Sequence, residues 1–417
     1  MHFERLEITN WRQFSKVEID LHPQLTVLAG ANGAGKSTIL RLLAQHFGFN
    51  MPLLATPTQN KAGLFSYMSG FFGKRRANDP SNDPNWDDVG AVSYTSGNES
   101  RILVPKQNSA TYSAHFSSHQ AVPGLFINSH RPVSNYQPIA SIPTSGISVE
   151  QAYQQYHQEV LNKLNNSYTQ YSPIYRIKEA IISMATFGPG NKNVLGNEKT
   201  ERDYEDFKQM LAKVLPSTIG FLDISIRVPD VVMVTRTGEF VLDGASGGLM
   251  ALIDLAWQIF LYSRGKDAFV AVLDEPENHL HPSMQRVIIS NLIEAFPNAQ
   301  FIVATHSPFV VSSVKDSWVY VLRYLDGLET LGPRRTVYSQ RLDHYDKAGT
   351  ASEILQSVLG VPVTLPLWAE NQLDKIVGQY VIDEMDLEQI RRLRGELAEV
   401  GLGDYYSDAL TRIAQRQ

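Results

Sequence analysis

A glycine-rich stretch near the amino terminus carries the clearest chemistry in the chain. Residues 30–37, GANGAGKS, fit the pattern G-x-x-x-x-G-K-[ST] and lie between an expected strand and an expected helix, the context that a phosphate-binding loop requires. In such a loop, backbone N–H groups surround phosphate oxygens, the lysine reaches the β and γ phosphates, and the hydroxyl binds Mg²⁺. The candidate binding residues are Asn32, Gly33, Ala34, Gly35, Lys36, Ser37 and Thr38, and Ser37 is also a candidate ligand of Mg²⁺. The alternative is a simple turn with a solvated lysine.

Two adjacent carboxylates follow an apolar run later in the chain. The run 270–273 ends at Asp274 and Glu275, and ligands collect at the strand ends of open α/β sheets. We expect Asp274 to hold Mg²⁺ through water, and Glu275 to orient or deprotonate the water that attacks a bound nucleoside triphosphate. Apolar strands that end in an acidic turn are common, so this hypothesis depends on the pairing with the phosphate loop.

A second anion cradle is expected where another helix begins. Ser246 is a plausible N-cap of that helix, and Gly247 and Gly248 follow it with exposed N–H groups. This position suits the γ-phosphate of a nucleotide that another subunit holds, and the alternative is a plain helix cap. The pattern Gly244-x-Ser246-x-Gly248, with Asp274 and a later histidine, also matches the order of a serine hydrolase. That alternative leaves the phosphate loop unused and gives the serine no preceding apolar strand.

His306 follows the apolar strand expected over 301–304. This strand is expected beside the one that ends at Asp274, so the imidazole would hydrogen-bond the γ-phosphate or the attacking water, or else be structural. His279 and His281 raise the alternative of a zinc site, but the chain has no cysteine and its carboxylates are already assigned to Mg²⁺. A loop at a subunit interface is the other interpretation of these two histidines.

The elements that must position these residues alternate along much of the chain. Strand patterns open it, three helical patterns follow between residues 149 and 214, and strands then alternate with helices over 246–304, which indicates a largely parallel α/β sheet. Residues 51–118 are expected to form long loops with two strands, and residues beyond 348 to be helical. We therefore expect an N-terminal lobe with the phosphate loop (1–148), a helical insertion (149–216), a C-terminal lobe (217–340) and a helical tail (341–417).

Composition excludes several classes of protein. The 417 residues are 43% apolar and carry a formal charge of −6, so the protein is not coated in basic surface. No apolar run reaches the ~18 to 20 residues of a membrane span, and the amino terminus does not resemble a signal peptide, so we expect a soluble, cytoplasmic protein. The absence of cysteine excludes disulfides and a thiol nucleophile. Any nucleic-acid contact would have to be local or be supplied by a partner. The three short basic runs are Lys74-Arg75-Arg76, Arg334-Arg335, and Arg391-Arg392 with Arg394.

Four motifs, in this order, resemble the ABC-type ATPase heads of the RecF and SMC group. They are the phosphate loop, LDGASGG (242–248), VLDEPENHLHP (272–282) and ATHSP (304–308), and the resemblance covers about residues 1–50 and 240–312. It implies an ATPase head with a mostly parallel core sheet and an N-terminal antiparallel β part, bound ATP and Mg²⁺, and a dimer closed around ATP. Residues 276–281 correspond to a loop that crosses the dimer interface.

The resemblance adds two arginines. Asn10-Trp11-Arg12-Gln13-Phe14 is similar to a turn whose basic residue touches the nucleotide, so Arg12 is a candidate, or else an exposed turn arginine. Residues 126–132 are similar to a segment of compact bacterial defence ATPases, which makes Arg131 a candidate. Gln120 and Gln137 flank this segment, and neither has the usual position of a Q-loop glutamine.

The short insertion, the ENHLHP sequence and the helical tail look most like the compact ATPases of anti-phage systems, such as the PtuA type of Septu and certain retrons or the AriA type of PARIS. The resemblance implies a separate nuclease or effector as partner, since the chain lacks the D-x-D of a TOPRIM domain and an HNH pattern. A RecF-like DNA repair ATPase shares every motif, and a transporter ATPase subunit is a further alternative that the large insertion disfavours.

Overall fold

The structure, a computed structural model, describes residues 1–59, 63, 65–70, 83, 85–106, 109–129, 136–143, 145–164, 167–325, 336–343, 347–359, 366–381 and 385–415. It divides into two compact units, Met1–Ile354 and Leu355–Gln417. The four-part division expected from the sequence stays a prediction.

Within the described residues, eleven strands of the first unit form one sheet, in the order β10-β8-β7-β1-β2-β18-β17-β3-β16-β15-β11. The last five strands in this order pair in parallel with one another. Three of them, β3, β16 and β15, are buried along their whole length. These strands are β17 (Trp318–Leu325), β3 (Leu25–Gly30), β16 (Ala299–Ala304), β15 (Phe269–Asp274) and β11 (Gly124–Ile127). Continuous apolar runs are typical of parallel strands that are covered on both faces.

The other half of the sheet is antiparallel and includes the amino terminus. It consists of β1 (Phe3–Trp11), β2 (Phe14–Asp20), β7 (Trp86–Tyr94), β8 (Glu99–Pro105) and β10 (His115–Phe116). Strand β18 (Thr336–Arg341) joins the halves, since it pairs in parallel with β2 and antiparallel with β17. The predicted fold class, an α/β protein with a parallel core and an N-terminal antiparallel part, is confirmed.

Short strands occupy part of the region expected to be loops. Strand β4 (Leu53–Leu54) pairs with β9 (Thr111–Tyr112), and β5 (Thr56–Gln59) pairs with β6 (Phe65–Met68). Strands of two to four residues are too short to leave a period-two pattern in the sequence, so the prediction of long loops was incomplete there.

Helix α1 (Lys36–Ala44) follows β3 and continues into a 3₁₀ turn, η1 (Gln45–Phe47). It packs against the parallel strands β3, β16, β15 and β11. Helix α5 (Gly247–Ser263) precedes β15, and the short α8 (Pro308–Val311) follows β16. The helical stretch expected between β15 and β16 is divided into α6 (Pro282–Gln285) and α7 (Ile288–Ala295), which Arg286 and Val287 separate.

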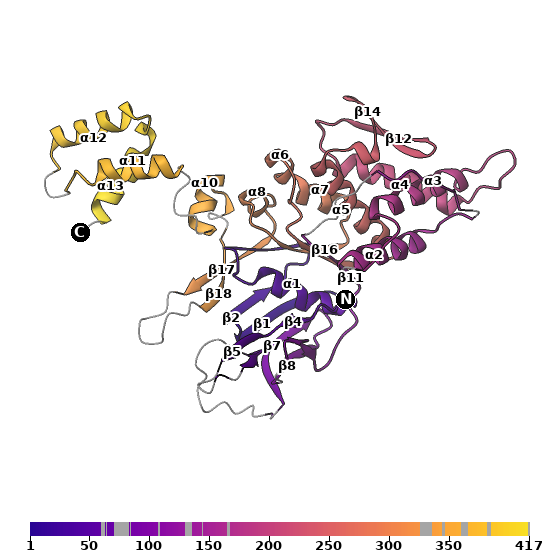
Figure 1. The fold of residues 1–417 in the computed structure, drawn as a ribbon, viewed down its shortest axis with the longest axis horizontal. Helices are drawn as coiled ribbons and strands as arrows, with labels where there is room; N and C mark the ends of the chain where they lie inside the picture. Colours follow the sequence, from indigo (N-terminus) through magenta and orange to yellow (C-terminus); the bar gives the residue numbers. More distant parts are fainter. Residues whose placement is uncertain are drawn as a thin grey trace. The chain divides into compact units, whose positions relative to one another are not determined.

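The expected insertion is helical. Helices α2 (Val149–Leu164), α3 (Pro173–Phe187) and α4 (Glu198–Val214) pack on one another, and α2 and α4 also pack on α5 (Figure 1). After α4, β12 (Phe221–Arg227), β13 (Asp230–Thr235) and β14 (Gly238–Val241) form an antiparallel sheet. The 3₁₀ turn η2 (Leu242–Gly244) then leads into α5.

The first unit ends near α10 (Ala351–Glu353), and the π-helical η4 (Ile354–Val358) spans the boundary between the units. The second unit contains α11 (Leu367–Val377), α12 (Leu387–Glu399), the 3₁₀ turn η6 (Gly403–Tyr405) and α13 (Tyr406–Gln415). Its own small core includes Leu373, Val377, Leu393, Leu397 and Ala409.

Candidate active site

Three neighbouring parallel strands end at the same edge of the sheet and bring three of the four sequence motifs together. Asp274 at the end of β15 lies opposite Ala304 of β16, and Ala304 lies opposite Leu28 of β3. The phosphate loop follows β3, the carboxylates end β15, and His306 follows β16. The predicted residues of these three segments therefore meet because the carboxyl ends of parallel strands share one edge.

The phosphate loop has the backbone that its glycines permit. Gly30, Gly33 and Gly35 have φ values of 140°, 77° and 101°, which side-chain-bearing residues rarely adopt. A Cβ at Gly35 would also lie 2.3 Å from the Phe14 ring. Helix α1 begins after Gly35 with no capping side chain and no acidic residue in its first turn. Its positive end is therefore suited to an external anion such as phosphate.

Lys36 is buried at the centre of this edge. Its Nζ donates hydrogen bonds to the Gly30 carbonyl at 3.0 Å and the Ala31 carbonyl at 3.3 Å, and it lies 2.8 Å from Nε2 of His306. Burial lowers the pKa of Lys36 to about 8, although three nearby carboxylates act in the opposite direction. Burial and the Lys36 charge also lower the pKa of His306, so a neutral imidazole accepts from the ammonium.

Ser37 and Asp274 form a donor set for a hard cation. Ser37 Oγ donates to Asp274 Oδ1 at 3.2 Å, and Asp274 is buried. Burial raises the pKa of Asp274, while the Ser37 hydrogen bond and the nearby Arg41 and Lys36 charges lower it. One hydroxyl and one carboxylate beside a phosphate cradle are the oxygen ligands that Mg²⁺ takes when phosphates complete its shell. The residues therefore fit Mg²⁺ with a nucleotide.

Glu275 is held in an unusual backbone conformation next to His306. Its φ of 48° is left-handed, and its N–H donates to the Ala304 carbonyl at 2.9 Å. Carboxylate Oε1 lies 3.4 Å from His306 Nε2, and Oε2 accepts from Asn278 Nδ2 at 2.8 Å. Left-handed non-glycine residues cost energy and cluster at functional sites. This conformation places the carboxylate at the sheet edge beside His306.

The Ser246 segment is exposed and is not joined to this cluster. Ser246 caps α5, and its Oγ accepts from Leu249 N–H at 3.4 Å. A Cβ at Gly247 would meet nothing within 4 Å, whereas a Cβ at Gly248 would lie 2.6 Å from the His279 carbonyl oxygen. Because Ser246 follows a 3₁₀ turn and His306 contacts Lys36 and Glu275, the geometry of a serine hydrolase is not formed.

Comparison with known proteins identifies the family. Residues 93–311, more than half of the chain, match a family described as AAA ATPase domain. The chain belongs to this family. Residues 5–66 also match a family described as AAA domain. The membership confirms the predicted class of enzyme, an ATPase, and implies nucleotide binding.

Individual relatives carry names from two kinds of system. A Septu protein PtuA of Bacillus mycoides is 21% identical over 95% of this chain and 50% of the relative. A Septu protein PtuA of Bacillus thuringiensis is 26% identical over 42% of this chain and 46% of the relative. The Retron Vc95 probable ATPase of Vibrio cholerae is 40% identical over 14% of this chain and 11% of the relative. The predicted relationship to Septu and retron ATPases is confirmed, and the chain spans about half the length, or less, of these relatives.

Solved structures of SMC head domains are distantly similar. A head domain from Thermotoga maritima has a TM-score of 0.42 and 14% identity over 82% of this chain and 100% of that one. An Smc head bound to the C-winged helix domain of ScpA has a TM-score of 0.44 and 18% identity over 83% of this chain and 100% of that one.

The same edge of the sheet includes a carboxylate that the sequence analysis does not assign to the site. Glu277 is buried, and its Oε1 accepts hydrogen bonds from Thr305 Oγ1 and from the His306 N–H, the latter at 3.2 Å. Burial raises the pKa of Glu277. This side chain ties the loop after β15 to the loop after β16. The sequence signal for this residue is the second glutamate of the motif Glu275-Pro276-Glu277, a segment for which the sequence analysis indicates only an interface loop.

Two further side chains touch the phosphate loop of the ATPase. Gln13 Nε2 donates to the Gly33 carbonyl at 3.4 Å, and Tyr324 Oη of β17 donates to the Asn32 carbonyl at 3.3 Å. Arg12 has φ 51°, its N–H donates to the Gly70 carbonyl, and its guanidinium lies 5.9 Å from the Trp11 ring. The turn predicted to reach the nucleotide thus contacts the loop through Gln13, and the role of Arg12 stays a prediction.

Other candidates lie elsewhere or outside the described residues. His281 Nδ1 contacts Ser283 at the start of α6, and within the described ranges no group of three or more His, Cys, Asp or Glu is gathered to hold a metal. Gln137 contacts the connection between α2 and α3, and Gln120 donates to the Ser118 carbonyl. Arg131 and the basic runs at 74–76 and 334–335 lie outside the described residues. No helix in the described part of the chain is long and apolar enough to span a membrane.

Proposed function

We propose that the chain binds Mg-ATP at the edge formed by β3, β15 and β16 and hydrolyses it. The observation that carries this proposal is that five polar side chains converge at this edge. Nε2 of His306 lies 2.8 Å from Lys36 Nζ and 3.4 Å from Glu275 Oε1. Ser37 Oγ lies 3.2 Å from Asp274 Oδ1. These are the groups that neutralise phosphates, ligate Mg²⁺ and activate water in phosphoryl transfer.

Each group has a distinct task. The amides of residues 33–38 and Lys36 Nζ bind the phosphates, and Ser37 Oγ and Asp274 hold Mg²⁺, which supplies positive charge to the γ-phosphate when it is bound. Glu275 accepts a proton from the attacking water, and neutral His306 donates a hydrogen bond to the γ-phosphate or that water. Lys36 exchanges its contact with His306 for phosphate oxygens, which frees the imidazole for this task.

The site is completed by Ser246, Gly247 and Gly248 of a second copy. This step is supported by the exposure of Ser246 and Gly247 and by the open space around Gly247. The N-terminus of α5 presents amide groups and a partial positive charge there, which suits a γ-phosphate. Two copies would therefore enclose two ATP molecules between them.

Mixed subunits test both proposals. Lys36→Ala alone should lose ATP binding, and Ser246→Arg alone should bind ATP without pairing, because the cradle is filled by bulk and charge. A heterodimer of the two retains one intact composite site and should recover hydrolysis. If heterodimers form but hydrolyse no ATP at any mixing ratio, the result would argue against composite sites. If Lys36→Ala binds ATP with unchanged affinity, the assignment of residues 30–37 as a phosphate loop is wrong.

We further propose that this ATPase gates a separate effector, a nuclease, in cytoplasmic anti-phage defence. The names of its Septu and retron relatives support this role, and the second unit supplies helical surface that ATP hydrolysis does not need. The purified chain should hydrolyse ATP and leave plasmid DNA and transfer RNA intact with Mg²⁺ or Mn²⁺. Cleavage by the isolated chain, lost on a substitution outside the ATP motifs, would overturn the gating role. Strong stimulation of hydrolysis by DNA would favour the RecF-like alternative.

A further inference from the structure

A buried lysine from the helical insertion contacts the segment that leads to Ser246. Lys178 of α3 is fully buried. Its Nζ donates to the Gln137 carbonyl at 2.6 Å and lies 2.7 Å from Asp243 Oδ2 and 3.7 Å from Asp230 Oδ1. Asp243 belongs to η2, only three residues before Ser246. A charge contact therefore links the insertion to the start of α5.

Asp243 depends on this lysine for its charge balance. Its side chain is only 6% exposed, and its two oxygens accept no aligned hydrogen bond from any residue in the described ranges. Among the described residues, the Lys178 ammonium forms an ion pair with this carboxylate and offsets its charge. Removal of one partner of a buried pair leaves an uncompensated charge, which is strongly unfavourable. Without Lys178, we expect η2 to shift so that Asp243 reaches water, and Ser246 to shift with it.

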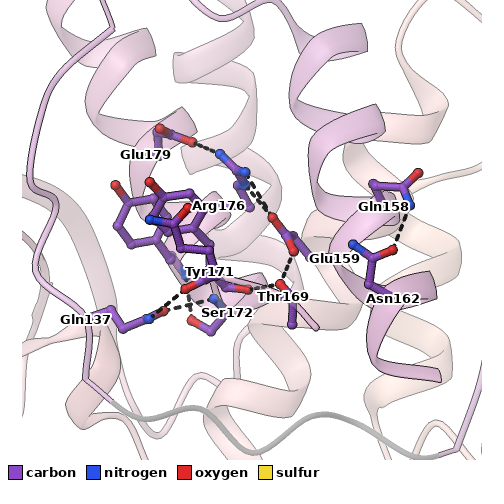
Figure 2. A network of polar contacts seen from close by, with 11 residues as sticks. Gln137, Gln158, Glu159, Asn162, Thr169, Tyr171, Ser172, Arg176 and Glu179 are labelled. Atoms are coloured by element: carbon purple, nitrogen blue, oxygen red, sulfur yellow. Dashed lines mark hydrogen bonds and ion pairs between the residues drawn. The ribbon is translucent and has the colours of Figure 1, made fainter. Parts of the chain in front are cut away.

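Polar contacts also fix the helix that carries Lys178. Gln137 Oε1 accepts from the Ser172 N–H at 2.9 Å, and its Nε2 donates to the Gln170 carbonyl at 3.3 Å, just before α3. Figure 2 shows Gln137 at one end of this network and Arg176 between Glu159 and Glu179. Arg176 lies 2.9 Å from Glu159 of α2 and 2.8 Å from Glu179. These contacts hold α3 against α2 and so define where the ammonium lies.

We propose that Lys178 is a positioning residue for ATP hydrolysis in the opposite subunit. The inference rests on the proposed composite site. Lys178 acts through Asp243 on Ser246. Among the described residues, the polar and ring contacts of its ammonium are with Gln137, Asp230, Asp243 and the Tyr136 ring, all distinct from the phosphate loop. Buried ion pairs add little net stability, but they can specify a single geometry. The geometry specified here is that of the cradle offered to the other copy.

The test places one substitution in either subunit of a defined heterodimer. Ser246→Arg and Lys36→Ala subunits carry different tags and are purified as a heterodimer. Its one intact site combines the phosphate loop of the Ser246→Arg subunit with Ser246 of the Lys36→Ala subunit. Lys178→Met in that subunit should lower kcat by about tenfold or more, because a displacement of about 1 Å at a reacting site has effects of this size, with a smaller change in KM for ATP. The same substitution in the Ser246→Arg subunit should leave the rate nearly unchanged.

A matched control uses another lysine of the insertion. Lys208 of α4 pairs with Glu205 at 2.9 Å and with Asp223 of β12 at 3.0 Å, without contact to η2, so Lys208→Met should have little effect in either subunit. Where Lys178→Met subunits do not fold, Asp243→Asn carries the same test with the shape of the side chain retained. An equal loss in both placements, or no loss in either, would overturn the positioning role. Inactivity of the parent heterodimer would instead overturn the composite site, and this inference with it.

Discussion

We assign two faces to one ATP site, the face with the phosphate loop and the face that carries Ser246. They differ in the contacts that their key side chains make within one chain. On the phosphate-loop face, Lys36 is buried and contacts His306 and two carbonyl groups. On the other face, Ser246 is exposed, and its hydroxyl only caps its own helix. The first face is held by tertiary contacts, so substitutions there act on one chain. On the second face, the Ser246 hydroxyl bonds only to its own helix among the described residues, so substitution of Ser246 should act when two copies meet.

The largest effect is expected at the base of the phosphate-loop face. Glu275→Gln should slow ATP hydrolysis by ~10²-fold or more, since an amide cannot accept the proton of water. ATP binding should persist, because Lys36, Ser37 and Asp274 are unchanged. ATP-bound pairs should then accumulate, which size-exclusion chromatography with ATP detects. Glu294→Gln, on the exposed side of α7, serves as the control. Hydrolysis at the wild-type rate would mean that the base lies elsewhere.

Adjacent glycines of the second face separate a structural requirement from a functional one. Gly248→Ala should destabilise the chain by ~1–3 kcal/mol, because the new Cβ would lie 2.6 Å from the His279 carbonyl oxygen. Gly247→Ala should leave the unfolding temperature unchanged or slightly higher, since its Cβ meets no atom within 4 Å.

Hydrolysis at several protein concentrations then shows what Gly247 does. If Gly247→Ala unfolds like the wild-type protein but pairs less with ATP, the space around Gly247 is needed by the partner's nucleotide. If it unfolds normally and pairs and hydrolyses normally, the Ser246 face does not form part of a composite site. This pair of substitutions therefore tests the contrast between the two faces directly.

The elements of the site were predictable where local pattern and motif coincide. The strand, loop and helix around Lys36 follow from an apolar run, glycines and a helical period, and β15 and β16 follow from apolar runs. The contact of Tyr324 with Asn32 was not predictable, because it joins β17 to a loop some 290 residues earlier. Such contacts depend on strand order, which a single sequence does not encode locally.

Two other features show the same limit. Strand β18 was missed because TVYSQR is mostly polar and only partly buried, yet it joins the two halves of the sheet. At Gly248 the sequence suggested a phosphate contact, and the structure adds a tertiary reason for glycine, the approach of the His279 carbonyl. Motifs indicate which chemistry to expect, but they do not separate the residues that touch a ligand from those that touch the fold.

The smallest expected effect concerns the stability of the phosphate-loop face as a function of pH. The pKa of Lys36 is lowered by burial to about 8, from 10.5 for an unperturbed lysine. Between these values the unfolded chain binds more protons than the folded chain, so the free energy of unfolding rises with pH in this window. Below pH 8 both states carry the charged lysine, and the cost of burying it is present in full. Lys36→Met should therefore be most stabilised, relative to the wild-type protein, at pH 7.

This advantage should diminish by on the order of a few degrees in unfolding temperature as pH rises from 7 to 10. Other lysines with a lowered pKa, such as Lys347, are present in both proteins, so their contributions cancel in the difference. Burial, the largest cause of the lowered pKa of His306, is the same in both proteins and moves that pKa away from this alkaline range. Thermal unfolding of both proteins across this range measures the difference. A constant difference would show that Lys36 titrates normally, and the phosphate-loop face would then be as open to water as the face that carries Ser246.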